Sequence, residues 1–227
     1  MPSLPRAWVS GFFNPWRCGI IVFYGGIAPF GYGRNFIIGG FVLNNFLETV
    51  IQKASWKKAV LFSALFAASY VLINYSGIGV AGLLKITGGA NILDFEFGYS
   101  YEKAYNMLTA LGVEGRTFYL TKILPMDYPF PLTYMLFYIG FIALLIKHTA
   151  KNKPYRFLLF IPVLAMLFDW IENIGLITML SSYPNLLEWA VPVASIFGML
   201  KTIFMVGSIM IIGVLLVMFV YSKIRKE

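Results

Sequence analysis

Two carboxylic acids and a carboxamide, Asp169, Glu172 and Asn173, lie inside an apolar run at residues 157–180. This run is long enough to cross a bilayer core of about 30 Å, which takes about 20 helical residues. Ionisable groups at that depth are costly and usually face a bundle interior or a wet cavity. At helical spacing the three side chains share one face. That face could serve proton transfer, recognition of a polar group or ion pairing.

The last apolar run of the chain supplies a cation at a matching depth. Asp169 and Lys201 each lie about ten residues from the outer end of their helix. At about 1.5 Å per residue, both are roughly 15 Å below the outer surface. We therefore predict that Lys201 pairs with Asp169 or Glu172. Asn173 and Thr202 are expected to complete the hydrogen bonding of this pair.

These residues allow a functional and a structural interpretation. Asp127 marks the outer start of the second apolar run, so acids from Asp127 through Glu172 to Asp169 could form a proton path or a general acid/base pair. Alternatively, the charged groups form a buried ion-pair network that fixes which helices pack together. Glu172 and Asp169 are the candidate catalytic residues. The candidate ligand-binding residues are Asp127, Tyr134, Asp169, Glu172, Asn173 and Lys201.

The composition is typical of an integral membrane protein. Hydrophobic residues make up 59% of the 227 residues and charged residues 12%, with a mean hydropathy of +0.76, which is too apolar for a soluble domain of this length. The net charge of +8 does not indicate a nucleic-acid partner, because the basic residues cluster beside the apolar runs. Cys18 and His148 are the only residues of their types, so we predict no disulfide within the chain, no metal site and no cofactor.

Four apolar runs predict an all-α, polytopic fold, in which four transmembrane helices form a bundle. The runs cover residues 59–84, 128–146, 157–180 and 191–221. If they alternate in direction, ten basic residues share one side of the membrane, namely Lys53, Lys57, Lys58, Lys147, Lys151, Lys153, Arg156, Lys223, Arg225 and Lys226. The positive-inside rule then predicts a multi-pass protein of the inner (plasma) membrane, with both ends of the four-helix unit in the cytoplasm.

The first outer loop, residues 85–127, is long enough to be partly helical. Ser100 can cap a helix that begins at Tyr101 and ends at Gly112. A second short helix is expected over residues 113–124, where Pro125 stops it. We expect both helices to lie on the outer membrane surface or to cap the mouth of the bundle.

Residues 1–49 fit poorly with the four-helix domain at residues 50–227. Their apolar stretch contains Pro29, Arg34 and many glycines, and a spanning helix there would place Arg6 and Arg17 outside, against the charge rule. We expect a re-entrant or interfacial segment, or a start codon placed too far upstream.

A glycine-rich stretch at residues 77–82 matches a dinucleotide-binding pattern only formally, because no strand precedes it. We interpret it as close helix packing or an unwound helix end. Near it, Tyr70 and Asn74 could turn inward and line a polar pocket, together with Tyr134 and Tyr138 of the second run.

Residues 57–226 resemble a group of bacterial four-helix integral membrane proteins. The resemblance rests on Tyr99, Ala104, Tyr105, Leu111, Gly112, Gly115, Arg116, Asp127, Phe130, Pro131, Tyr134, Asp169, Glu172 and Asn173. It implies the same four-helix topology and supplies no chemistry.

Three functions are compatible with these patterns. The preferred one is the binding or transport of a small amphiphile or lipid in a polar pocket within the membrane, where Glu172 and Asp169 recognise its polar end. The second is a membrane-embedded, isomerase-like enzyme that modifies a lipid, with the same residues as acid and base. The third is a structural or assembly subunit. The expected partners are the lipid bilayer, such a ligand and further copies in a homo-oligomer, which small residues such as Ala194 and Gly198 could support.

Overall fold

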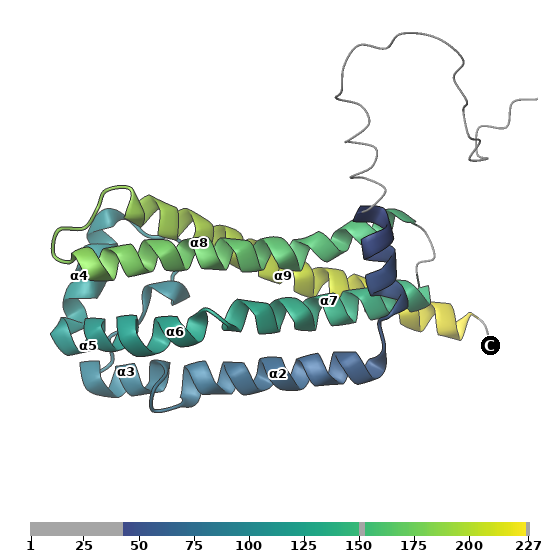
Figure 1. Ribbon diagram of the computed structural model, residues 1–227, viewed down its shortest axis with the longest axis horizontal. Coiled ribbons are helices and arrows are strands. Elements are labelled where there is room, and N and C mark those ends of the chain that lie inside the picture. Colours follow the sequence, from purple (N-terminus) through teal and green to yellow (C-terminus); the bar gives the residue numbers. More distant parts are fainter. Residues whose placement is uncertain (1–42, 150–152, 226–227) are drawn as a thin grey trace, which may run out of the picture. The chain divides into compact units, whose positions relative to one another are not determined.

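The computed structural model describes residues 43–149 and 153–225, where every regular element is a helix (Figure 1). The predicted all-α fold is therefore confirmed. Four helical stretches in this part of the chain are long and apolar enough to cross a membrane, namely Trp56–Thr87, Gly112–Thr149, Tyr155–Ser182 and Ala190–Ile224. The predicted N-terminal segment covers residues 1–49. Residues 1–42 lie outside the described part of the chain, and residues 43–52 form a helix.

The four stretches contain the long helices α2 (Trp56–Tyr75), α7 (Phe130–Thr149), α8 (Phe160–Ser182) and α9 (Ala190–Ile224). Helices α8 and α9 form the most extensive pair, α7 packs against α2, α8 and α9, and α2 rests mainly on α7 (Figure 1). The bundle is therefore built around α7, with α2 and α9 on different sides of it.

The closest approach of α8 and α9 depends on Gly175. A Cβ atom at this position would lie 2.8 Å from the Cβ of Ala194 and 3.0 Å from the backbone oxygen of Ala190. These separations are shorter than van der Waals contact, so only glycine lets the two helix backbones meet here. This contact brings the polar residues of α8 up against α9.

The first apolar run, residues 59–84, is not one continuous helix. After residues 76–79 the chain starts a new helix, α3 (Val80–Thr87). A Cβ atom on Gly82 would lie 2.0 Å from the carbonyl oxygen of Gly77, so the turn between the helices is too tight for a larger residue. The interpretation of this glycine-rich stretch as an unwound helix end is confirmed.

The predicted outer loop contains the short helix η1 (Leu93–Phe95) and the helix α4 (Tyr101–Ala110). As predicted, Ser100 caps α4, because its hydroxyl oxygen accepts a hydrogen bond from the backbone N–H of Lys103 at 3.2 Å. Gly112 has a left-handed backbone with φ of 64° and turns the chain out of the helix.

The prediction that the next helix stops at Pro125 is wrong. Helix α5 (Gly112–Phe118) passes into a π-helical turn, η2 (Tyr119–Ile123), and then into α6 (Leu124–Asp127). Pro125 lies in the first turn of α6. The π-helical turn directly before α6 changes the hydrogen-bonding pattern of the helix at the point where Pro125 has no N–H to donate.

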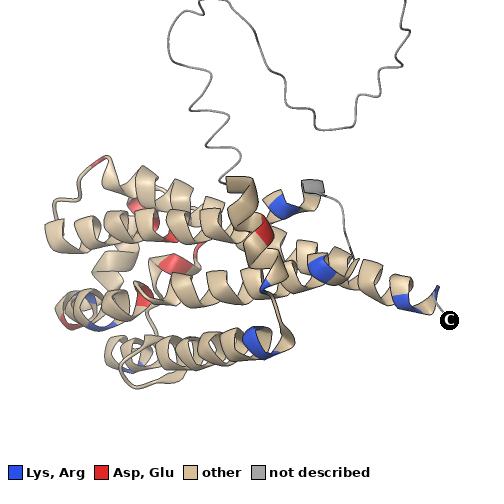
Figure 2. Cartoon of the chain, turned by 45° about the vertical axis from the view of Figure 1, so that its right-hand side comes forward, with Lys and Arg blue, Asp and Glu red and all other residues tan. Residues whose placement is uncertain are grey.

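The two ends of the bundle differ in charge. Figure 2 shows most Lys and Arg residues of the long helices gathered where α2 begins and α7 and α9 end. We call this the basic end, and its basic residues include Lys53, Lys57, Lys58, Lys147, Arg156, Lys223 and Arg225. The opposite end, which η1, α4 and α5 cover, is the loop end. The assignment of the basic end to the cytoplasm stays a prediction.

Candidate functional site

Lys201 on α9 lies among three carboxylates. Its Nζ atom is 2.5 Å from Oε2 of Glu172, 3.6 Å from Oδ1 of Asp169 and 3.6 Å from Oδ1 of Asp94. The predicted pairing of Lys201 with a carboxylate of α8 is confirmed, and Lys201 reaches both of them. Glu172 is only 1% exposed and Lys201 9%, so the ion pairs are shielded from solvent.

The position of Glu172 depends on a glycine of the facing helix. A Cβ atom on Gly198 would lie 2.5 Å from Oε1 of Glu172 and 2.9 Å from its carboxyl carbon. The carboxylate of Glu172 therefore rests directly on the backbone of α9, one turn before Lys201. This arrangement explains why Glu172 makes the shortest of the three contacts with the ammonium group.

Asp169 and Asp127 are joined by the carboxamide of Asn173. The Nδ2 atom of Asn173 donates to Oδ2 of Asp127 at 2.8 Å and to Oδ1 of Asp169 at 3.5 Å. The phenol of Tyr134 on α7 donates to Oδ2 of Asp169 at 3.0 Å. These bonds connect α6, α7 and α8. The link between Asp127 and Asp169 therefore runs through Asn173, whereas the sequence predicted a path through Glu172.

Asp94 belongs to this cluster and was missed by the sequence prediction. It lies in η1, its Oδ1 atom faces Lys201, and its Oδ2 atom accepts a hydrogen bond from the phenol of Tyr119. One signal could have pointed to it: Asp94 has apolar neighbours on both sides, Leu93 and Phe95, in a loop that is otherwise rich in polar residues. That pattern does not predict how deeply the loop folds into the bundle.

The predicted contribution of Thr202 is wrong. Its hydroxyl donates to the backbone oxygen of Gly198 at 3.0 Å, within α9, and does not bond to the charged cluster. A helical threonine has this carbonyl within easy reach one turn earlier, and the bond costs no rearrangement.

Tyr99 approaches the cluster from the segment before α4. Its backbone N–H donates to Oγ of Ser195 at 2.8 Å, which holds this segment against α9. Burial raises the pKa of the Tyr99 phenol, and the nearby carboxylates of Glu172 and Asp94 raise it further. The phenol is therefore a neutral donor at neutral pH, and its buried oxygen has no hydrogen-bond partner among the described residues.

The cluster carries more acids than bases. Asp94, Asp127, Asp169 and Glu172 meet a single ammonium group, since Lys201 is the only basic residue of the described chain within 4.0 Å of any of them. Fully ionised, the group would hold three negative charges in excess, which is too costly in a buried site. The excess must therefore be balanced by protons or by a cationic group that is not among the described residues.

A cavity of 310 Å³ lies beside these residues. Its polar wall contains Asp94, Asp127, Asp169, Lys201, Asn74 and Thr202. The remaining lining is apolar and consists of Ile73, Val80, Ile92, Phe95, Ile123, Phe130, Met205, Val206 and Ile209. The cavity thus combines a charged wall with an apolar body, as sites for amphiphilic ligands do.

The cavity reaches exposed apolar residues on the outer surface of the bundle. Val206 and Ile209, which line it, are 49% and 57% exposed. Ile73 and Asn74 contribute to its wall from α2, which packs mainly on α7. The opening therefore lies between α2 and α9, on the side of the bundle.

The predicted site residues fall into two groups. Asp127, Asp169 and Lys201 line the cavity. Tyr134, Glu172 and Asn173 lie behind this wall and contact its members, as shown by the bonds of Tyr134 and Asn173 to Asp169 and by the ion pair of Glu172 with Lys201. Of the further residues expected at a pocket, Asn74 lines the cavity, whereas Tyr70 is 43% exposed on the bundle surface.

No protein-family model, no curated protein and no solved structure matches the chain. The resemblance to bacterial four-helix membrane proteins therefore stays a prediction from the sequence.

Proposed function

We propose that this integral membrane protein binds an amphiphile with a cationic amine at its polar end. The observation that supports this proposal best is the composition of the cavity wall, which presents Asp94, Asp127 and Asp169 against one lysine. An amine would bring positive charge and several N–H donors to carboxylates that the described residues neutralise only in part. An anionic polar end would add to the excess negative charge and is disfavoured.

The apolar part of the ligand would lie against the hydrophobic lining and extend through the opening between α2 and α9. Val206 and Ile209 at this opening would contact both the ligand and the surrounding lipid tails. A ligand longer than the 310 Å³ cavity would therefore fit, with its tail in the bilayer. Entry from the membrane also suits a ligand that partitions into lipid before it binds.

We further propose that the basic end faces the cytoplasm of the inner (plasma) membrane. The basic residues gathered at that end support this orientation through the positive-inside rule. The cavity would then open into the outer half of the bilayer, since it is lined by the part of α2 near the loop end, at Ile73 and Asn74.

The preference for an amine can be measured with ligands that differ only in their polar end. Protein in lipid nanodiscs is incubated with decylamine, decanol or decanoate, and the bound fraction is determined by native mass spectrometry. We expect decylamine to bind about tenfold more tightly than decanol, because its hydrogen bonds to the carboxylates are between charged groups and are stronger than those of a hydroxyl group. Decanoate should show no specific binding.

The variant Asp127→Asn tests the site itself. Asp127 lines the cavity and bonds to Asn173 but is not paired with Lys201, so its neutralisation leaves the ammonium group paired. We expect the affinity for decylamine to fall about tenfold. The matched control is Glu114→Gln, an exposed acid at the loop end, which should bind like the wild type. Equal binding of decylamine and decanol, or an unchanged affinity in Asp127→Asn, would refute the proposal.

A second candidate is an isomerase-like enzyme that moves a proton on a bound lipid. It is favoured by one observation: Asp127 and Asp169 both line the cavity and share the amide of Asn173, so a proton donor and an acceptor face the same space. Asp169 is the better candidate catalyst of the two predicted residues, because Glu172 does not line the cavity. Membrane lipids incubated with the protein in D₂O should then take up deuterium, and Asp169→Asn should abolish this uptake while Glu114→Gln preserves it.

A further inference from the structure

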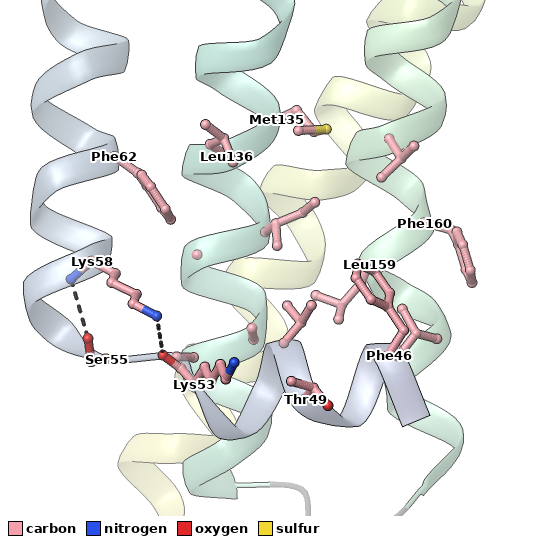
Figure 3. A pocket seen from close by; sticks show the side chains of 17 residues that line it. Phe46, Thr49, Lys53, Ser55, Lys58, Phe62, Met135, Leu136, Leu159 and Phe160 are labelled. Atoms are coloured by element: carbon pink, nitrogen blue, oxygen red, sulfur yellow. Dashed lines mark hydrogen bonds between the residues drawn. The ribbon is translucent and has the colours of Figure 1, made fainter. Parts of the chain in front are cut away.

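A larger cavity, of 560 Å³, lies at the basic end of the bundle, away from the charged cluster (Figure 3). The helix at residues 43–52, α2, α7 and the start of α8 enclose it. Its body is apolar and includes Phe62, Met135, Leu136, Leu159 and Phe160, which Figure 3 shows along its walls. The volume and the apolar lining suit hydrocarbon chains.

Two lysines lie at the rim of this cavity, where the helix at residues 43–52 meets α2. Lys58 donates from Nζ to the backbone oxygen of Lys53 at 3.0 Å, so both ammonium-bearing residues lie at the same corner (Figure 3). An ammonium group has three N–H donors, so this bond leaves two donors of Lys58 for other acceptors. Thr49 and Ser55 add hydroxyl groups to the same rim.

No acid counters these charges within the cavity. The described lining contains no Asp or Glu, and the nearest acid along the chain, Glu48, lies 3.9 Å from Arg156 instead. The rim therefore offers positive charge and hydroxyl groups above an apolar body. An occupant that matches both parts has an anionic head and hydrocarbon tails.

The rim also lies at a depth suited to lipid headgroups. Trp56 begins α2 beside it and is 52% exposed, as expected of an aromatic residue at the membrane interface. Basic pockets between transmembrane helices are a recurring way of binding anionic lipid heads. We propose that this cavity binds an anionic phospholipid, with its phosphate between Lys53 and Lys58 and its acyl chains along α2, α7 and α8.

The test compares two lipids that share the same acyl chains. The full-length protein is purified in detergent, stripped of lipid and titrated with phosphatidylglycerol or phosphatidylcholine, and bound lipid is counted by native mass spectrometry. We expect phosphatidylglycerol to bind about tenfold more tightly, because each lysine near an anionic lipid head adds attraction. In the double variant Lys53→Gln/Lys58→Gln this preference should disappear.

The matched control removes two other lysines from the same end. Lys57→Gln/Lys223→Gln changes the net charge equally, but neither residue lines the cavity and both are exposed, so the lipid preference should persist. A third variant, Val163→Phe, fills the apolar body and leaves the lysines unchanged. It should weaken the binding of both lipids.

Three results would overturn the proposal. The first is equal binding of the two lipids to the wild type. The second is a control pair, Lys57→Gln/Lys223→Gln, that loses the preference as fully as the cavity pair, because the effect would then come from surface charge in general. The third is unchanged lipid binding by Val163→Phe, which would place the acyl chains elsewhere.

Discussion

Replacement of Lys201 by methionine is expected to lower the free energy of unfolding by about 3–5 kcal/mol, because it removes one partner of a buried ion-pair network. The ammonium group contacts Asp94, Asp169 and Glu172, and it is the only basic group of the described chain that reaches them. Without it, the three carboxylates repel one another in a shielded site. Thermal unfolding of the purified protein in detergent would measure the loss.

Two comparisons identify the source of this effect. Lys223→Met removes an exposed lysine at the other end of α9 and should leave the melting temperature nearly unchanged. Addition of Glu172→Gln to Lys201→Met should restore part of the lost stability, because it removes the carboxylate that lay closest to the ammonium group. If Lys201→Met melts like the wild type, the carboxylates do not depend on Lys201 and the ion-pair network is not a major source of stability.

The variant Gly175→Val is expected to destabilise the protein by about 3 kcal/mol, at the upper end of the usual cost of overpacking. Even the first carbon of the new side chain would lie 2.8 Å from the Cβ of Ala194 and 3.0 Å from the backbone oxygen of Ala190. Backbone atoms of a helix cannot move aside independently, so α8 and α9 must separate. The denaturation midpoint in detergent measures this loss.

The same substitution at Gly213 provides the control. Apart from the adjacent backbone of α9 itself, no heavy atom lies within 4 Å of a Cβ atom built at this position, so Gly213→Val should cost little. Because Gly175 lies one turn from Glu172, separation of the helices should also weaken the pairing of Glu172 with Lys201. Equal stability of the two variants would contradict the close contact between α8 and α9.

The long apolar helices and the polar face of α8 could be predicted from the sequence. Spans are visible because bilayer thickness fixes their length, and the positions of Asp169, Glu172 and Asn173 follow from the helical period alone. The pairing with Lys201 could also be predicted. Two consecutive helices with a short connection lie side by side, so residues at equal distances from that connection come close together.

The remaining part of the site could not be predicted, because it depends on how the outer loop folds back. Asp94 reaches Lys201 only through the tertiary position of η1, which no periodic pattern encodes. Thr202 was assigned to the cluster although its own helix offers an acceptor at Gly198. The continuation of the chain through Pro125 escaped prediction because a π-helical turn has no strong sequence signature.

The π-helical turn η2 holds a residue that the alignment of the site can spare. A turn of this kind accommodates one residue more than an α-helical turn does. Tyr119 at its start and Asp127 after its end are both buried and both belong to the charged cluster, through Asp94 and Asn173. Deletion of one residue from η2 would remove this extra residue and leave an α-helical turn, in which the following helix keeps its direction. A deletion from α6 ahead of Asp127 would instead turn Asp127 by about 100° relative to Tyr119. A one-residue deletion should therefore disturb the charged cluster less in η2 than in α6.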